Sequence, residues 1–189
     1  QRQMCIRDSV AESIALMKLD HAVVTSVDRD DLPDLGAGHW AHTIREIKRL
    51  NPQTTIEVLI PDFQGRMELV DLVIEANPDI ISHNMETVRR ISPLVRSAAN
   101  YDTSLQVIGH IARSGTKSKS GIMVGLGETP QEVETIMDDL LANSTFKELP
   151  KEVTDYQVNQ CLNSTTPWPT TTATIWTALC SCLLYTSPS

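Results

Sequence analysis

The feature that most constrains the fold is an alternation of short apolar runs with amphipathic helical patterns between residues 10 and 142. Short runs rich in β-branched side chains are typical of strands that are buried on both faces. Segments with apolar residues at helical spacing separate these runs, so the predicted order is α, β, α, β, α, β, α, α, β, α. The predicted strands lie at residues 22–27, 55–60, 79–82 and 121–126.

The last predicted helix has the clearest beginning. Thr129 stands at the N-cap, Pro130 follows at the first helical position, and Glu132 completes a capping box. Two earlier helices are expected to end at Asn51-Pro52 and Asn77-Pro78, because the residue before a proline avoids the helical region. The apolar stripes expected to face a sheet are Trp40, Ile44, Ile47 and Leu50; Met67, Val70, Val73 and Ile74; Leu105, Ile108 and Ile111; and Val133, Ile136, Met137 and Leu140.

Such an alternation predicts an α/β fold with a parallel sheet and right-handed crossovers. The pattern fits either an open doubly wound sheet or part of a βα barrel. Only four strands can be recognised, whereas a complete eight-stranded barrel needs about 250 residues, so a barrel would be incomplete in this chain. In both architectures functional residues gather at the carboxyl ends of the strands.

Polar side chains follow each predicted strand. The first strand leads into a dense polar cluster at residues 25–31, and the second into residues 61–66. Hydrogen-bonding side chains at residues 82–87 follow the third, where leaving them unpaired would cost about 1 to 3 kcal/mol each. A lone histidine such as His83 is more often structural than catalytic. Glycines in residues 121–128 allow a close approach to a ligand, but the third glycine of a dinucleotide fingerprint is missing.

Composition narrows the class of partner. With 24 acidic and 16 basic residues, the formal net charge is −8, which opposes binding to phosphate backbones, so no nucleic-acid partner is expected. No window holds the roughly 18 apolar residues of a membrane span, so no membrane partner is expected and a cytoplasmic location is the default. The cysteines stand only near the two ends, which predicts no disulfide framework. His39 and His42 lack further ligands, so no metal site is predicted.

The two ends differ from the core at residues 10–142. Residues 144–189 contain ten threonines, five serines and only five charged residues, a composition that favours an extended or disordered segment. We therefore expect residues 143–189 to form a divergent, Thr-rich tail that is non-native or disordered at its end. Residues 1–9 resemble translated adaptor or vector sequence and are expected to be a non-native end.

Four segments, taken in order, resemble lipoyl synthase: residues 24–32, 57–63, 83–88 and 119–128. The resemblance covers about residues 10–141. It implies a radical S-adenosylmethionine enzyme built on a partial βα (TIM-like) barrel that is incomplete in this chain. Members of that family insert two sulfur atoms at the sixth and eighth carbons of an octanoyl chain carried by a lipoyl-carrier protein domain, which completes lipoate biosynthesis.

The same resemblance implies the cofactors, which are S-adenosylmethionine and two 4Fe-4S clusters in the full family enzyme. It assigns no catalytic residue in this chain. Asn84 and Glu86 would help to hold S-adenosylmethionine. The residues that match the strand motif bordering its adenosine are Gly121, Gly125 and Glu128, and those that would line the same cavity are Thr25, Ser26 and Asp28.

The chain departs from the family pattern at its cluster ligands. The family's Cys-x-x-x-Cys-x-x-Cys motif and its auxiliary three-cysteine motif both precede the first strand, and neither stands in this sequence. The C-terminal Arg-Ser-Ser-Tyr is also absent. We therefore expect an internal fragment of a lipoyl synthase that is inactive as it stands. The alternative is a non-catalytic paralogue that binds a lipoyl-carrier domain or S-adenosylmethionine.

Overall fold

A computed structural model describes residues 2–96 and 99–143, with side chains from Ser9 onward. Of the Thr-rich tail predicted at residues 143–189, all but residue 143 lies outside the described part of the chain. The elements are α1 (Arg2–Met17), β1 (His21–Thr25), α2 (Ala37–Leu50), β2 (Thr55–Leu59), a 3-10 turn η1 (Phe63–Gly65), α3 (Met67–Glu75), β3 (Ile80–Ser82), α4 (Ser92–Val95), α5 (Tyr101–Arg113), β4 (Lys117–Lys119) and α6 (Pro130–Ala142). The predicted order of helices and strands is confirmed.

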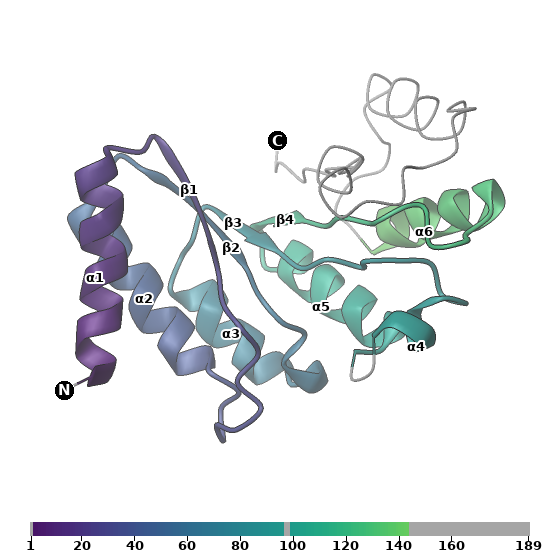
Figure 1. Ribbon diagram of the computed structural model, residues 1–189, viewed down its shortest axis with the longest axis horizontal. Helices are drawn as coiled ribbons and strands as arrows, with labels where there is room; N and C mark the ends of the chain where they lie inside the picture. The colour runs from purple at the N-terminus through teal and green to yellow at the C-terminus, as the bar shows by residue number, and fades with distance from the viewer. Residues whose placement is uncertain (1, 97–98, 144–189) are drawn as a thin grey trace.

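The four strands form one parallel sheet in the order β1-β2-β3-β4, which is also their order in the chain. Helices α1, α2, α3 and α5 lie next to one another in the same order along the sheet (Figure 1). A doubly wound sheet reverses its strand order at a switch point, and this sheet does not. Of the two architectures that the sequence pattern allowed, the fold is therefore an arc of a βα barrel.

The fourth strand does not lie where the sequence predicted it. Residues 121–126 were expected to form it, but β4 is Lys117–Lys119, and beyond it only a single bridge joins Ile122 to Glu86. Lys-Ser-Lys has no apolar signature, and Lys119 tolerates its place in the sheet because its Nζ lies 2.8 and 3.0 Å from the Glu57 carboxylate oxygens. Gly125 adopts a φ of 107°, which takes the backbone out of the extended region.

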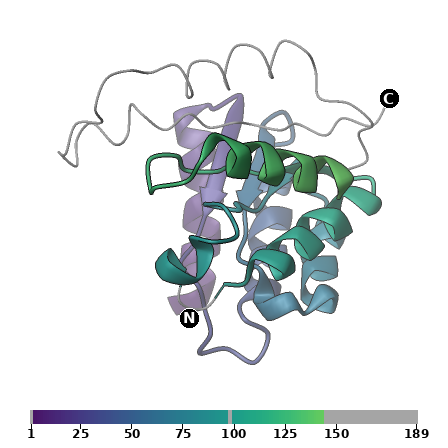
Figure 2. The ribbon, with the colours of Figure 1, turned by 90° about the vertical axis from the view of Figure 1, so that its right-hand side faces the viewer.

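The hydrophobic core has two parts. The larger one fills the space between the sheet and helices α1, α2, α3 and α5, and contains Ile44, Val58 and Val70. The smaller one lies between α5, α6 and the segment after β3, and contains Met85 and Ile136. Figure 2 shows α6 beside α5, away from the row formed by α1, α2 and α3.

The helix predictions are largely confirmed. The capping box is formed, because Thr129 Oγ1 accepts from the Glu132 backbone N–H at 3.3 Å while the Glu132 carboxylate accepts from the Thr129 backbone N–H at 2.8 Å. Helix α2 ends at Leu50 and α3 at Glu75, just before the two Asn-Pro pairs. Leu50 is the exception within its stripe, since 38% of it is exposed at the end of α2.

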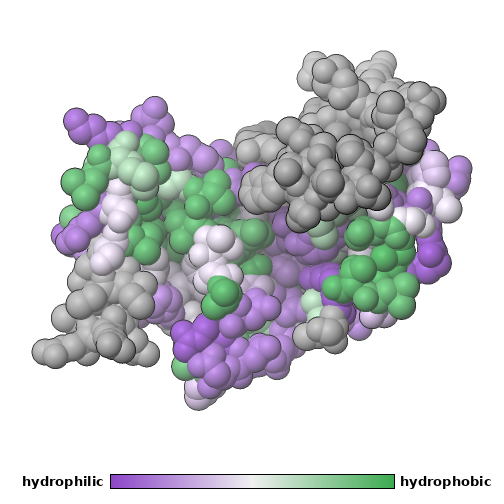
Figure 3. Space-filling model, in the orientation of Figure 1, coloured by the Kyte–Doolittle hydropathy of each residue, from purple (hydrophilic) through white to green (hydrophobic). Residues whose placement is uncertain are grey.

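Some apolar side chains remain at the surface. Figure 3 shows hydrophobic surface around the carboxyl end of α1 and around α4, where Leu16, Met17 and Leu94 are exposed. Val23 of β1 is 56% exposed, and its neighbours Ala22 and Val24 pack into the larger core. Since side chains alternate along a strand, Val23 lies on the face of the sheet opposite the helices.

Candidate functional site

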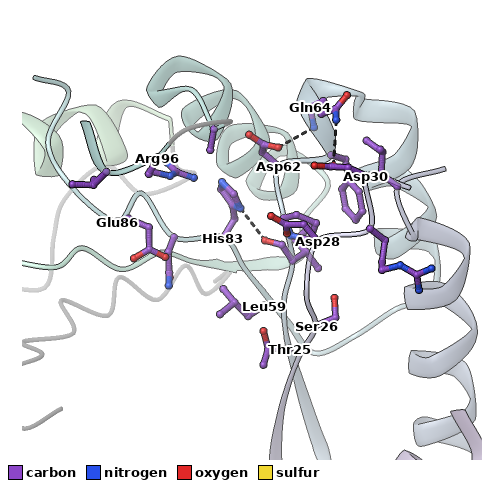
Figure 4. Close-up of a pocket in the computed structure, with 18 residues that line it drawn as sticks. Thr25, Ser26, Asp28, Asp30, Leu59, Asp62, Gln64, His83, Glu86 and Arg96 are labelled. Carbon is purple, nitrogen blue, oxygen red and sulfur yellow. Dashed lines mark hydrogen bonds between the residues drawn. The ribbon is translucent and has the colours of Figure 1, made fainter. Parts of the chain in front are cut away.

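An open cavity of about 490 Å³ lies at the carboxyl ends of β1, β2 and β3 (Figure 4). The strands bring together loops that are far apart in the sequence, because parallel strands end at the same edge of a sheet. The residues that line the cavity are Thr25, Ser26, Asp28, Arg29, Asp30, Leu35, Leu59, Ile60, Pro61, Asp62, Phe63, Gln64, His83, Asn84, Glu86, Val95, Arg96 and Ala99.

The last residue of β1 and the loop after it supply two hydroxyls and two carboxylates, from Thr25, Ser26, Asp28 and Asp30. Farther along the same loop, the carboxylate of Asp34 accepts backbone N–H groups at 3.1 and 3.0 Å, and these hydrogen bonds lower its pKa. That closed turn fixes where α2 begins. The side chains nearer the strand remain exposed at the cavity.

The loop after β2 is tied to the loop after β1. Asp62 Oδ1 accepts from the Gln64 backbone N–H at 2.9 Å, and Gln64 Nε2 donates to Asp30 Oδ1 at 3.2 Å (Figure 4). Phe63 and Gln64 both have positive φ values, 47° and 55°, which non-glycine residues rarely adopt. Strained backbone of this kind clusters at functional sites, where the surrounding structure holds it in place.

His83 follows β3 and is only 3% exposed. Its Nδ1 lies 2.9 Å from the Ile60 carbonyl oxygen and its Nε2 lies 2.9 Å from Ser104 Oγ. Because a carbonyl can only accept, Nδ1 carries the proton and Nε2 accepts from the serine hydroxyl. Burial lowers the pKa of His83, and the nearby Arg96 charge acts in the same direction. The imidazole is therefore neutral and fixed in one tautomer.

Asn84 and Glu86 face the cavity and contact the segment after β4. The Glu86 backbone N–H donates to the Gly121 carbonyl at 3.1 Å, and the Met123 N–H donates to the Glu86 carbonyl at 2.6 Å. A Cβ on Gly121 would stand 3.1 Å from Asn84 Oδ1, so a larger residue there would press on the Asn84 amide.

The eight residues predicted for the site are only partly brought together. Thr25, Ser26, Asp28, Asn84 and Glu86 line the cavity, and Gly121 packs against Asn84. Two others do not line it, Gly125 and Glu128. The Glu128 carboxylate instead accepts from the backbone N–H groups of Gly125 and Leu126, which closes its own loop before α6.

Six polar residues that line the cavity were not predicted as site residues: Arg29, Asp30, Asp62, Gln64, His83 and Arg96. Asp30 and Asp62 stand in the polar runs that follow the first two strands, and these runs could have marked both residues as part of the site. Gln64 belongs to the second of these runs. Arg96 stands more than ten residues after β3, beyond the short α4, and no local pattern marks it.

The electrostatics of the cavity are mainly acidic. Carboxylates of Asp28, Asp30, Asp62 and Glu86 line it. Of the two guanidinium groups, Arg29 is engaged by Asp31, with Nε to Oδ1 at 2.8 Å, and this hydrogen bond lowers the Asp31 pKa. Such a lining favours a ligand that carries positive charge and several hydroxyls.

A comparison with protein families decides which family this architecture belongs to. The model of the radical SAM superfamily matches residues 7–140, which spans every strand of the sheet and nearly all of α6. The chain belongs to the radical SAM superfamily. Its sequential strand order and the cavity at the carboxyl ends of the strands agree with that assignment.

Several curated proteins named lipoyl synthase are closely similar to this chain. A protein named lipoyl synthase from Bacteroides fragilis is 80% identical over 133 residues, covering 70% of this chain and 46% of the relative. Lipoyl synthases from Phocaeicola vulgatus and Parabacteroides distasonis are 79% and 71% identical over 133 residues, in each case 70% of this chain and 47% of the relative. The chain thus spans a little under half the length of these relatives.

Radical SAM enzymes combine S-adenosylmethionine with an iron–sulfur cluster held by thiolates. Within residues 9–96 and 99–143, whose side chains the structure describes, no three His, Cys, Asp or Glu side chains form a group that suits a metal ion. These residues therefore do not fit a cluster, whereas the polar cavity fits S-adenosylmethionine. None of the described helices is long and apolar enough to cross a membrane.

Proposed function

We propose that this chain is part of a lipoyl synthase, a radical SAM enzyme that inserts two sulfur atoms at the sixth and eighth carbons of a protein-bound octanoyl chain. The observation that carries the proposal is the 80% identity over 133 residues to a relative of that name. Similarity at this level leaves little room for a different arrangement of the strand ends that form the cavity. The octanoyl substrate would be attached to a lipoyl-carrier protein domain.

Within this proposal, the cavity holds S-adenosylmethionine. Asp28 and Glu86 would face its sulfonium and ammonium charges, while Asn84 and the hydroxyls of Thr25 and Ser26 would bind its ribose and amino-acid oxygens. When bound beside a cluster, S-adenosylmethionine supplies the radical that removes hydrogen from an unactivated carbon. The role of the chain's own residues is to bind and orient this cofactor. Because Gly121 has no side chain, the Asn84 amide can lie beside it without being displaced.

The two 4Fe-4S clusters of the full enzyme would be held by residues outside the described part of the chain, because the described side chains offer no fitting set. Gly125 and Glu128 would act indirectly. Their loop, closed by hydrogen bonds to the Glu128 carboxylate, sets the path of the backbone between Gly121 and α6.

A chimera tests the proposed reaction. Residues 10–142 of this chain replace the matching stretch of the Bacteroides fragilis lipoyl synthase, and lipoyl formation on an octanoylated carrier domain is measured by mass spectrometry. We expect the chimera to be active and the same chimera with Glu86→Gln to lose at least about tenfold, since a hydrogen bond to a charged group contributes about 1.5 to 3 kcal/mol. Glu68→Gln, at an exposed position of α3, is the matched control.

The control variant should keep the activity of the parent chimera. A folded chimera with normal iron content but no lipoyl product would contradict the proposed substrate. Equal activity of the Glu86→Gln and Glu68→Gln chimeras would contradict the placement of S-adenosylmethionine against Glu86.

A further inference from the structure

Strand β4 is held in the sheet by an ion pair. It has only three residues, Lys-Ser-Lys, and among the described strands it pairs only with β3. Lys119, its last residue, reaches across β3 to β2, where its Nζ lies 2.8 and 3.0 Å from the carboxylate oxygens of Glu57. Ser82 of β3 donates to the same carboxylate at 2.8 Å. Three neighbouring strands are therefore joined at one carboxylate.

This ion pair is shielded from water. Only 4% of the Glu57 side chain and 14% of the Lys119 side chain are exposed. Opposite charges attract each other more strongly inside a protein than in water, because the surrounding dielectric constant is lower. The pair therefore fixes the end of β4 relative to β2, although the two strands are not hydrogen-bonded neighbours.

The backbone that begins at Lys119 holds the polar segment after β3. The Lys119 carbonyl accepts from the His83 N–H at 3.0 Å. Farther along, the Gly121 carbonyl accepts from the Glu86 N–H at 3.1 Å. Asn84 lies between these contacts, and its amide oxygen is 3.1 Å from the place that a Cβ on Gly121 would take. The segment after β3 is thus placed by the end of β4.

We propose that Lys119 is a positioning residue for the strand-end cavity. Its ion pair with Glu57 fixes the end of β4, and the end of β4 in turn places Asn84 and Glu86 where they face the ligand. The inference rests on the proposed function, in which these two side chains bind S-adenosylmethionine. Lys119 does not itself line the cavity, so it acts through the backbone rather than by touching the ligand.

Amide hydrogen exchange of the full chain, without ligand, tests the positioning step. Lys119→Met removes the ion pair, and we expect faster exchange in residues 83–86 and 119–123 while β1 and α2 stay protected. Lys119→Arg keeps the charge and should restore most of the protection. Unchanged exchange in residues 83–86 of Lys119→Met would overturn the inference.

Lys48→Met is the matched control for the exchange experiment. Lys48 Nζ lies 3.3 Å from Asp79 Oδ1, so this substitution also removes a lysine–carboxylate pair, but one just before β3 instead of after it. Residues 83–86 should keep the exchange of the unmodified chain in this variant. Faster exchange there in both variants would mean that the segment responds to any lost ion pair, which contradicts a specific role of Lys119.

Equilibrium dialysis of S-adenosylmethionine with the same variants tests the consequence for binding. Lys119→Met should weaken binding at least about fivefold, because residues in one network of ion pairs and hydrogen bonds are energetically coupled. In a background that already carries Asn84→Ala and Glu86→Gln, the same substitution should have little further effect. A general loss of stability would instead weaken binding by the same factor in both backgrounds, and that result would overturn the positioning role.

A variant with Glu57→Leu and Lys119→Met separates positioning from stability. Replacing a buried ion pair by apolar side chains of similar volume is often neutral or stabilising. We expect this variant to unfold at the same temperature as the unmodified chain, or a higher one, and still to bind S-adenosylmethionine more weakly. Affinity equal to that of the unmodified chain would show that the pair serves stability alone.

The outcomes separate this inference from the proposed function. If the unmodified chain does not bind S-adenosylmethionine, the placement of that ligand in the cavity fails, and hydrogen exchange alone decides whether Lys119 positions residues 83–86. If the unmodified chain and Lys119→Met bind equally well, the role of Lys119 is overturned while S-adenosylmethionine binding stands.

Discussion

Glu57 places a carboxylate inside the sheet, with only 3% of the residue exposed. It accepts from Lys119 Nζ at 2.8 and 3.0 Å and from Ser82 Oγ at 2.8 Å, and so joins β2 to β3 and β4. Ile56 and Val58, on either side of Glu57 in β2, pack toward the helices. The ion pair of Glu57 with Lys119 therefore lies on the opposite face of the sheet. Breaking such a buried pair leaves an uncompensated charge behind.

We predict that Glu57→Gln lowers the free energy of unfolding by about 3 kcal/mol, because it removes the carboxylate charge from a buried ion pair with Lys119. Urea denaturation measures the loss. Glu68→Gln, which breaks an exposed pair with Arg66, should cost less than about 1 kcal/mol. Adding Lys119→Met to Glu57→Gln should recover part of the stability. Equal losses in Glu57→Gln and Glu68→Gln would contradict the prediction.

His83 makes stability depend on pH. Burial lowers its folded-state pKa, while the unfolded chain has a histidine pKa of about 6.5. As the pH falls below that value, the unfolded state takes up a proton that the folded state refuses, so the stability contributed by neutral His83 is present above it and is lost below it. We predict that His83→Gln makes the free energy of unfolding less dependent on pH between pH 8 and pH 5.

The comparison with a surface histidine isolates this effect. His42→Gln, at an exposed position of α2, should leave the pH dependence of the unmodified chain in place. Parallel curves for His83→Gln and the unmodified chain would show that His83 gains its proton in both states alike. Chemical denaturation at a series of pH values supplies both curves.

The sequence placed polar side chains at the ends of the strands, and the structure brings Thr25, Asp28 and Asn84 to one cavity because parallel strands end at one edge of the sheet. Their roles in binding, which the family resemblance implied, stay predictions. Glu128 also follows a strand-like segment, but its carboxylate is used by the backbone of its own loop. Arg96 reaches the cavity through a contact with Ser104 on α5, and a local pattern carries no information about such long-range contacts.

At the scale of elements, the capping box of α6 is the feature that the sequence predicted most completely. Thr129 at the N-cap and Glu132 one turn later bond each other's backbone N–H groups. The Glu132 pKa is lowered to about 2, first because its carboxylate accepts hydrogen bonds from Arg90 and then because it accepts from the Thr129 backbone. The beginning of α6 is therefore held by two independent contacts of one carboxylate.

We predict that Thr129→Ala destabilises the chain by about 1 kcal/mol, the usual cost of losing an N-cap hydroxyl. Thermal unfolding followed by circular dichroism measures it. Thr135→Ala, on the exposed side of the same helix, is the matched control, and it should be neutral or slightly stabilising because alanine has the higher helix propensity. A similar loss in both variants would contradict the role of the cap.

The positions of the elements were predictable from periodicity, with one informative failure. Apolar runs marked β1, β2 and β3 because their side chains pack toward the helices. Strand β4 lacks such a run, since Lys119 is satisfied by Glu57 rather than by apolar neighbours. The glycine-rich stretch that follows resembled a strand in composition, but Gly125 and Gly127 with positive φ turn the backbone away from the sheet.

At the scale of the whole molecule, the two parts of the core divide the chain at α5. Val107 and Ile111 of this helix pack into the larger core, whereas Leu105 and Ile108 pack into the smaller one. The smaller core contains α6 and the segment after β3, and no strand of the sheet contributes to it. Stability need not be uniform in such a molecule, because regions with fewer buried apolar contacts open at lower free energy.

We predict that Ile136→Ala increases amide hydrogen exchange in α6 and residues 85–91 while leaving β1 and β2 protected. Val58→Ala, in the larger core, should raise exchange throughout the sheet, because it lowers the stability of the part of the core to which β1, β2 and β3 contribute. Hydrogen exchange followed by mass spectrometry distinguishes the two. Identical exchange patterns in the two variants would mean that the chain opens as a single cooperative unit.

The match between strand order and chain order has a consequence for biosynthesis. As the polypeptide leaves the ribosome, β2 can pair with β1 as soon as α2 has emerged, and each later strand meets a neighbour already in place. Among the four strands that the structure describes, each pairs with the strand that comes next to it in the sequence. Translation therefore builds the sheet one βα unit at a time, and the last strand made is always the free edge that a nascent-chain chaperone has to protect.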